Sequence, residues 1–337
     1  MKTASILLAL LGVALMTGFA VWLGAGSIFK ATLSVGFGGF ALLVGWQLLC
    51  DVVLALAWRT SCPRALLKLG IGRLLLARMV REGAMTCLPF SQVGGILIGM
   101  RATGFGRALA WPLAVSANVV DLTTEVIGQI GFVLLGLLFL VDRRPDTDLA
   151  GPLGLGVLLA VAAMAGFIWA QRGAGGLFRR LARGMGDRVA GGAAFRRSVL
   201  DGIDSLQGDL DAFYARPGRI TGACLIHLAG WLGSAAWVWM AYRLLGAPLQ
   251  IGTALAIEGG ASGVLAVSFL VPGALGVQEA AYVALGSLFG LDAHLSFGLS
   301  LLRRARDLAI GAPILLLWQW VEVVRLRRGA KSVRQAA

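Results

Sequence analysis

Ionisable side chains interrupt two apolar stretches of the chain, and their types and spacing could support chemistry. Each stretch is long enough to cross a membrane, where a charged group marks a functional site by default because its burial in hydrocarbon is costly. The stretch 111–141 has its polar residues three and four positions apart, on one helix face, at Asn118, Asp121, Glu125 and Gln129. The stretch 295–320 contains Ser300, Arg303, Arg304, Arg306 and Asp307.

Asp121 and Glu125 are like charges one helical turn apart, so they need a cationic partner or a shared proton. A rise of ~1.5 Å per residue places them, and the arginines of the other stretch, near the middle of a ~30 Å core. We therefore expect Arg303, Arg304 or Arg306 to face these acids across a hydrated cavity that receives a substrate headgroup. The alternatives are a structural buried ion pair, or a helix boundary that leaves the arginines at the interface.

Four more charged residues are candidates for the same cavity, namely Arg101, Glu279, Glu82 and Glu258. No catalytic set accompanies them, because the chain has no GxSxG, HExxH, Walker or CxxC pattern. Two histidines and four scattered cysteines indicate neither a metal site nor a disulfide framework. We expect no metal, no cofactor and no enzymatic activity.

The elements that position these residues are membrane helices. The 337 residues are 58% hydrophobic and only 14% charged, with a mean hydropathy of +0.82. A soluble domain carries about a quarter charged residues, so soluble, disordered and disulfide-built classes are excluded. The stretches 4–23 and 151–170 each hold twenty residues without a charge. We predict one all-α, polytopic integral membrane domain over 1–337, with a retained first span.

Basic residues cluster in three regions, within 59–81, 172–219 and 325–334, and the net charge is +13. Cytoplasmic connections of membrane proteins are rich in Lys and Arg, so we expect these clusters and both termini to be cytoplasmic. The segment 171–218 is then a basic cytoplasmic loop on anionic headgroups, and 321–337 is a basic cytoplasmic tail. No basic domain stands apart from the spans, so no nucleic-acid partner is expected.

This orientation leaves too many apolar pieces for simple crossings, in 83–100 and in 249–290. Each half of the chain must cross the membrane an odd number of times between its cytoplasmic and outside connections. About six spanning helices plus two re-entrant, broken-helix hairpins meet this requirement, with one hairpin entering from each side. This predicts an inverted repeat of the kind that builds midplane sites in transporters. Ordinary proline-kinked spans are the alternative. The breaks predicted to form the hairpins are Pro89, Gly94 and Gly95 in the first, and Pro272, Gly273 and Gly276 in the second.

Three motifs together carry a resemblance to a known family: REGAMTCLPFSQVGGILIGMR at 81–101, FLVPGALGVQEAAYVA at 269–284 and LLRRARDL at 301–308. They resemble the lysylphosphatidylglycerol synthase transmembrane-region family of flippase-like proteins, over roughly 36–320. Within that family the likeness is greatest to the HpnL-type branch associated with hopanoid biosynthesis. Met85 and Ile96 depart from the first motif, where we expect Asn and Glu, which places a substrate role for the first hairpin in doubt.

The resemblance implies a lipid-handling protein of the bacterial inner (plasma) membrane, a flippase or transporter linked to hopanoid biosynthesis. Its partners would be membrane lipids, a hopanoid or a phospholipid, and lipid-biosynthesis enzymes. A non-transporting accessory subunit of the hopanoid pathway is the alternative, and an intramembrane enzyme using Asp121 and Glu125 is a third hypothesis. The residues expected to bind substrate are Arg303, Arg304, Arg306, Asp121, Glu125, Glu279, Gln278 and Arg101.

Overall fold

The computed structural model describes residues 33–88, 91–105, 109–143, 192–268 and 271–336, with isolated positions in 26–30 and 151–169. Every regular element in this part of the chain is a helix, which confirms the all-α class. The spans predicted at 4–23 and 151–170 fall largely outside it. Four helices there are long and apolar enough to cross a membrane: α3 (Gly36–Ser61), α6 (Trp111–Arg143), α9 (Pro217–Leu244) and the Ala293–Arg325 part of α12 (Ala293–Ala336).

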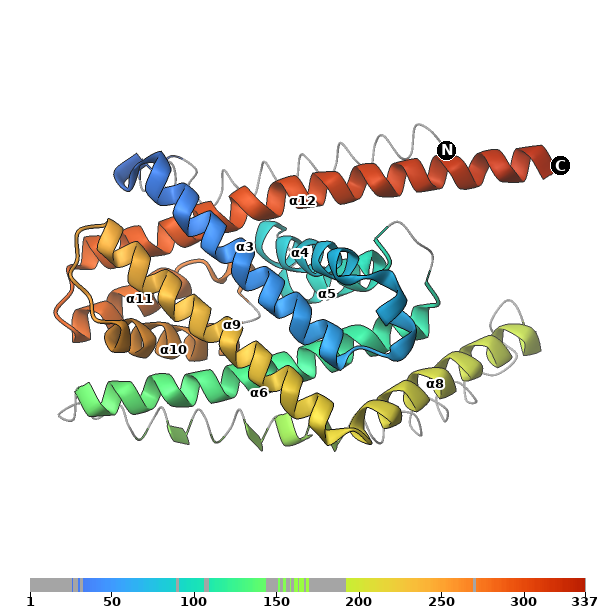
Figure 1. Cartoon of the computed structure of the whole chain (residues 1–337), viewed down its shortest axis with the longest axis horizontal. Coiled ribbons are helices and arrows are strands. Elements are labelled where there is room, and N and C mark those ends of the chain that lie inside the picture. The colour runs from blue at the N-terminus through green and yellow to red at the C-terminus, as the bar shows by residue number, and fades with distance from the viewer. Residues whose placement is uncertain are drawn as a thin grey trace.

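Two hairpins of short helices lie between these long helices (Figure 1). In each hairpin the second helix folds back antiparallel along the first, with Gly95 against Met85 and Gly260 against Leu285. Hairpin 1 comprises α4 (Ile71–Cys87) and α5 (Ser91–Ala102), after the short η1 (Arg64–Leu69). Hairpin 2 comprises α10 (Ile251–Val267), η2 (Pro272–Ala274) and α11 (Val277–Leu288).

Hairpin 1 begins earlier than the sequence predicts. We expected it within 83–100 and assigned Arg78 and Arg81 to a cytoplasmic connection, but both residues belong to α4 and are buried. The prediction was wrong because it counted basic residues as interfacial without regard to acids elsewhere in the chain that could neutralise them. Arg78 and Arg81 therefore belong to the interior of the protein.

The two hairpins enter the molecule from opposite ends. Helices α3 and α9 cross antiparallel: Trp237 Nε1 donates to the Leu43 carbonyl at 3.0 Å, and Trp46 Nε1 donates to the Gly233 carbonyl at 2.8 Å. Hairpin 1 follows the C-terminal end of α3, whereas hairpin 2 follows the C-terminal end of α9. Their open ends therefore face opposite ends of the long helices, as an inverted repeat requires.

Two glycine pairs show the same relation in the packing. A Cβ added to Gly83 in α4 would lie 3.0 Å from the Gly311 Cα in α12, and one added to Gly136 in α6 would lie 2.7 Å from the Gly259 Cα in α10. Gly259 follows Gly83 by 176 positions, and Gly311 follows Gly136 by 175. Each hairpin thus packs at close backbone range on the long helix of the other repeat, in a manner that only small residues permit.

The break in hairpin 2 depends on glycine, because Gly273 and Gly276 have φ angles of 60° and 76°. Residues other than glycine adopt such left-handed conformations only at a cost in free energy. In hairpin 1, by contrast, Gly94 and Gly95 lie inside α5 and not in a turn, and Pro89 lies outside the described residues. A Cβ at Gly95 would meet Met85, so that glycine serves a close helix contact.

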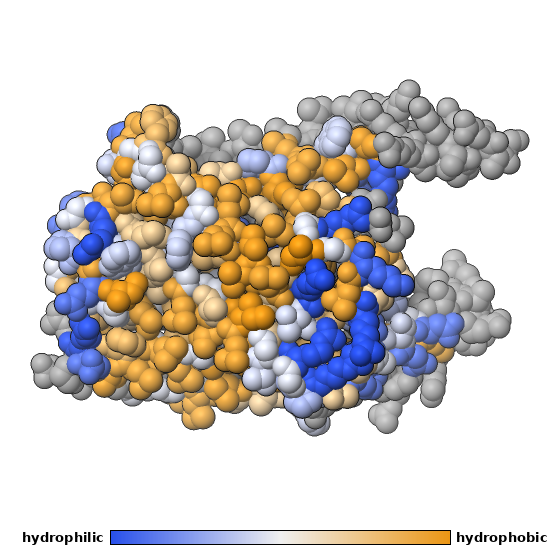
Figure 2. Space-filling model, viewed as in Figure 1, coloured by the Kyte–Doolittle hydropathy of each residue, from blue (hydrophilic) through white to orange (hydrophobic). Residues whose placement is uncertain are grey.

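The surface has the layout of a membrane protein. Apolar side chains cover the middle of the molecule, and hydrophilic ones gather toward its two ends (Figure 2). The apolar residues with more than half of their surface exposed include Phe37, Leu138 and Leu225, on three different long helices. These faces are suited to lipid tails.

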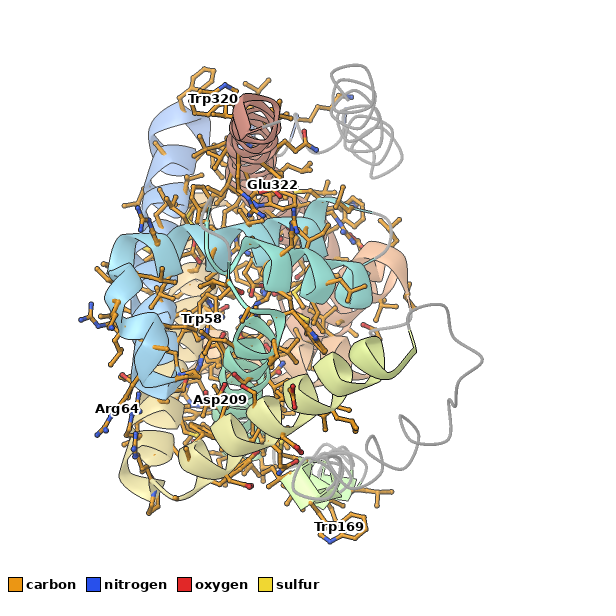
Figure 3. All side chains as sticks on the ribbon, turned by 90° about the vertical axis from the view of Figure 1, so that its right-hand side faces the viewer. Trp58, Arg64, Trp169, Asp209, Trp320 and Glu322 are labelled. Atoms are coloured by element: carbon orange, nitrogen blue, oxygen red, sulfur yellow. The ribbon has the colours of Figure 1, made fainter. Side chains whose placement is uncertain are left out.

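Helix α8 (Gly192–Tyr214) covers one end of the molecule, within the segment predicted as a basic loop. It packs on the N-terminal part of α6 through Leu210 and Phe213, which contact Val120. Asp209 of α8, labelled in Figure 3, accepts a hydrogen bond from the Ser116 hydroxyl of α6 at 2.9 Å. Residues 171–191 of that segment lie outside the described residues. The predicted tail 321–337 continues α12 as helix to Ala336.

Candidate functional site

A cavity of about 590 Å³ lies between the two hairpins, bounded by α3, α4, α6, α9, hairpin 2 and α12. Its wall contains four arginines and four carboxylates, far more charge than the interior of a membrane protein holds without a function. These charged residues are Asp51, Arg78, Glu82, Glu125, Arg303, Arg304, Arg306 and Asp307.

On the hairpin 1 side, Arg78 and Arg81 of α4 bind the acids of α6. Arg78 donates to Asp121 at 2.7 Å and to Glu125 at 2.6 Å. Arg81 contacts Asp121 at 2.8 Å and Glu125 at 3.1 Å. His227 Nε2 of α9 lies 3.2 Å from the other Asp121 oxygen. We call these five residues the α4–α6 network.

The α4–α6 network supplies the cations that neutralise Asp121 and Glu125. The side chains of Arg81 and Asp121 have no exposed surface, and charges so deep in a membrane protein persist only when they are paired. The predicted contact of these acids with Arg303, Arg304 or Arg306 is therefore wrong, because arginines on α4 occupy both carboxylates. Glu125 and the three α12 arginines do line one cavity, as expected, but they bind different partners.

On the hairpin 2 side, Arg303 of α12 pairs with Glu258 of α10 at 2.6 Å. Glu258 also accepts hydrogen bonds from Tyr282 of α11, at 2.6 Å, and from Ser234 of α9. Arg303 in addition donates to the Tyr282 hydroxyl. Glu258 is thus fully enclosed and joins three helices to α12.

Arg304 stabilises the non-helical turn that breaks hairpin 2 between α10 and α11. Its Nε donates to Glu279 at 2.7 Å, and its Nη1 donates to the Gly273 carbonyl at 2.9 Å. Glu279 in turn accepts a hydrogen bond from the backbone N–H of Gly276 at 2.8 Å, which caps the start of α11. Gln278 donates to the Ser300 hydroxyl at 2.7 Å. These contacts fix the turn where the backbone leaves helical geometry, and they satisfy the groups that the turn exposes.

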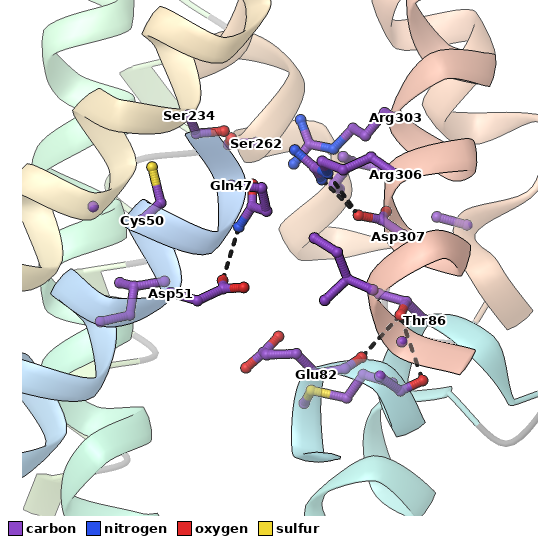
Figure 4. A pocket seen from close by; sticks show the side chains of 18 of the residues that line it. Gln47, Cys50, Asp51, Glu82, Thr86, Ser234, Ser262, Arg303, Arg306 and Asp307 are labelled. Carbon is purple, nitrogen blue, oxygen red and sulfur yellow. Dashed lines mark hydrogen bonds and ion pairs between the residues drawn. The ribbon is translucent and has the colours of Figure 1, made fainter. Parts of the chain in front are cut away.

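Three charged groups on the cavity wall have fewer partners (Figure 4). Asp51 accepts a hydrogen bond from Gln47 at 2.9 Å and points into the cavity from α3. Glu82 points toward it from α4, with 40% of its side chain exposed, and accepts from Arg81 at 3.3 Å. Arg306 pairs with the adjacent Asp307 at 2.6 Å and lies 4.5 Å from the centre of the Trp237 ring.

Arg101 does not belong to this site. It lies at the end of α5 with half of its side chain exposed, and it pairs with Glu322 near the far end of α12. Sequence reasoning also missed Asp51 and Arg78 as wall residues, and Arg81 as a partner of the buried acids. The available signal was the spacing of Arg78, Arg81 and Glu82, which places all three on one helix face.

The geometry agrees with a comparison of the whole sequence. Residues 9–314 match the family described as the lysylphosphatidylglycerol synthase TM region. The chain belongs to this family. Comparison with curated proteins and with solved structures found no match. Membership in the lysylphosphatidylglycerol synthase TM-region family indicates a membrane protein with a lipid-related function.

Proposed function

We propose that this protein is a lipid flippase that moves an amphiphilic lipid between the two leaflets of a membrane. The observation that carries the proposal is the charged cavity between two hairpins that enter from opposite ends. A headgroup that crosses the hydrocarbon core must replace its water contacts with other polar contacts. The cavity wall offers guanidinium groups for a phosphate and carboxylates for a hydroxyl or an amine.

The two repeats give the proposed flippase a means of exposing this cavity in turn. Hairpin 1 packs on α12 at Gly83 and Gly311, while hairpin 2 packs on α6 at Gly136 and Gly259. Helices that meet at glycines have no side chains interlocked at that point, so one helix can slide along the other. Transporters with inverted repeats expose their site to each side of the membrane in turn by moving one repeat against the other. The acyl chains or rings of the substrate would remain against the exposed apolar faces of the long helices.

We further propose that the protein belongs to the HpnL-type branch, is linked to hopanoid biosynthesis, and resides in the bacterial inner membrane with both termini cytoplasmic. Support comes from the motifs at 81–101, 269–284 and 301–308 and from the basic clusters. Three of the four arginines on the cavity wall are engaged in ion pairs that hold helices together, so we propose transport of a lipid and not its chemical conversion. Lipid-biosynthesis enzymes that supply the substrate would be its protein partners.

Leaflet exchange in vesicles tests the proposal. The full-length protein is reconstituted with a fluorescent phospholipid or a labelled hopanoid, and a membrane-impermeant quencher reports the outer-leaflet fraction over time. We expect accelerated exchange from the wild-type protein. Arg306→Gln, which removes a cavity cation but keeps the hairpin contacts, should slow exchange at least ~fivefold. Lys68→Gln, which removes an exposed cation outside the cavity, is the matched control and should exchange like wild type. Correctly folded wild-type protein that exchanges neither lipid would favour the accessory-subunit alternative.

A further inference from the structure

A second groove lies at the surface where α3 ends and α9 begins. It encloses about 580 Å³, is open to one side, and has no lining residue in common with the central cavity. Four of its seven lining residues are arginines, and none is acidic. The lining consists of Leu56, Arg59, Thr60, Arg64, Leu67, Arg216 and Arg219.

The groove differs from the cavity in its charge balance. Each arginine on the cavity wall has a carboxylate partner, such as Glu258 for Arg303 or Glu279 for Arg304. Within the described residues, no acidic side chain forms an ion pair with any arginine of the groove. The concentrated positive charge is therefore available for an anion from outside the chain.

One of the four arginines is held in place by the backbone. Arg219 Nε donates to the Thr60 carbonyl at 2.9 Å, and its Nη2 donates to the Cys62 carbonyl at 2.8 Å. These bonds join the first turn of α9 to the end of α3 and leave Nη1 for a further acceptor. A guanidinium group that is already ordered loses less entropy when it binds a phosphate oxygen.

The position of the groove indicates what kind of anion reaches it. Leu56 and Leu67 border it and are 44% and 37% exposed, and Leu56 lies on the lipid-facing part of α3. Figure 2 shows hydrophilic side chains gathered beside the apolar surface at this end of α3 and α9. Figure 3 shows Arg64 at the edge of the molecule, directed outward. This is the level at which phospholipid headgroups meet a membrane helix.

We propose that this groove binds the phosphate of an anionic phospholipid, whose acyl chains lie against Leu56 and the adjoining face of α3. Two or more arginines surround the phosphodiester, and the net negative charge of the headgroup region balances the positive charge of the groove. This lipid is a bound component of the protein and not cargo of the central cavity. The inference stands independently of the proposed flippase function.

Native mass spectrometry of the full-length protein in neutral detergent tests the proposal. The protein is titrated with phosphatidylglycerol, with phosphatidylcholine and with inorganic phosphate, and the first bound adduct gives an affinity. We expect phosphatidylglycerol to bind the wild type more tightly than the other two probes. The double variant Arg59→Gln/Arg216→Gln should weaken it about tenfold, the usual scale for lost charge-assisted hydrogen bonds. Lys68→Gln removes an exposed charge beside the groove and should leave the affinity unchanged.

Equal phosphatidylglycerol affinity in the double variant and the wild type would overturn the proposal. Binding of inorganic phosphate as tight as that of the lipid would assign the groove to a soluble anion, and equal binding of phosphatidylcholine would remove the need for net negative charge. Photoactivatable phosphatidylglycerol gives a readout on the wild-type protein alone, even if the double variant misfolds. Crosslinks should map to peptides within 54–67 or 215–225, and labelling confined to α12 would contradict the assignment.

Discussion

Arg78 and Asp121 form an ion pair at 2.7 Å, and the side chains of both are buried almost completely. The two residues join hairpin 1 to α6, from positions 43 apart in the chain. A charge in such surroundings is tolerated because its partner is present, so the pair should behave as a unit when either residue is changed.

The first prediction concerns this coupling. Arg78→Gln or Asp121→Asn alone should lower the free energy of unfolding by about 3–5 kcal/mol, because each leaves one uncompensated charge in a buried network of two arginines and two carboxylates. The double variant should cost less than the sum of the two, which a double-mutant cycle on thermal unfolding in detergent would measure. Arg304→Gln with Glu125→Gln is the control cycle, since these residues bind different partners, and it should be additive. Coupling in the control alone would show that the assignment of partners is wrong.

A second prediction concerns the packing of hairpin 2 on α6. Gly136→Ala would place a Cβ 2.7 Å from the Gly259 Cα, so the helices must separate, at a cost of about 1–3 kcal/mol. Gly131 lies on the same helix with its nearest neighbour, Leu228, at 4.0 Å, so Gly131→Ala should be neutral or stabilising. Unfolding temperatures of the two variants in one detergent give the comparison. Equal loss in both would mean that the close approach of the helices has no energetic importance.

The long helices could be predicted from the sequence because crossing a membrane demands an apolar stretch of fixed length. The stretches 111–141 and 295–320 therefore coincide with α6 and α12 to within a few residues at their starts. Hairpin 2 was readable for a similar reason, since Pro272 and Gly273 interrupt a stretch that otherwise has the composition of a span. These features depend on local composition.

The partners of the buried acids could not be read in this way. Pairing depends on which helices become neighbours, and Arg78 and Arg81 resemble the interfacial arginines that precede them in the chain. A usable signal existed in the repeat itself: a Glu-Gly pair occurs at Glu82 and again at Glu258, 176 positions later. Aligning the two halves on that pair would have placed Arg78 and Arg81 inside the first hairpin.

The third prediction concerns orientation. A cysteine introduced at Thr147, in the segment after α6 that we predict to lie outside, should react with an impermeant maleimide only from outside the cell. A cysteine at Asp201, on the exposed face of α8, should react only when the cytoplasmic side is opened. Cys50, Cys62 and Cys87 are buried, whereas Cys224 is partly exposed, so both cysteines are introduced into a Cys224→Ala background. The opposite labelling pattern would invert the proposed topology.

The fourth prediction uses the difference between the two equivalent acids of the repeat. Glu258 is fully buried and paired with Arg303, so Glu258→Gln should lower the free energy of unfolding by about 3–5 kcal/mol. Glu82 is 40% exposed on the cavity wall, and a half-exposed ion pair contributes about 1 kcal/mol or less, so Glu82→Gln should fold normally.

The two variants should then separate folding from transport. If the cavity handles a headgroup, Glu82→Gln should slow lipid exchange in vesicles by several-fold at unchanged unfolding temperature, because its carboxylate faces the space that the headgroup would occupy. Glu82→Asp, which keeps the charge, should recover part of the rate. A Glu82→Gln protein with wild-type exchange would assign that carboxylate to the structure, where it screens Arg78 and Arg81. A loss of stability equal to that of Glu258→Gln would show that the two repeats use their acids alike, and the asymmetry of the cavity would then have no functional meaning.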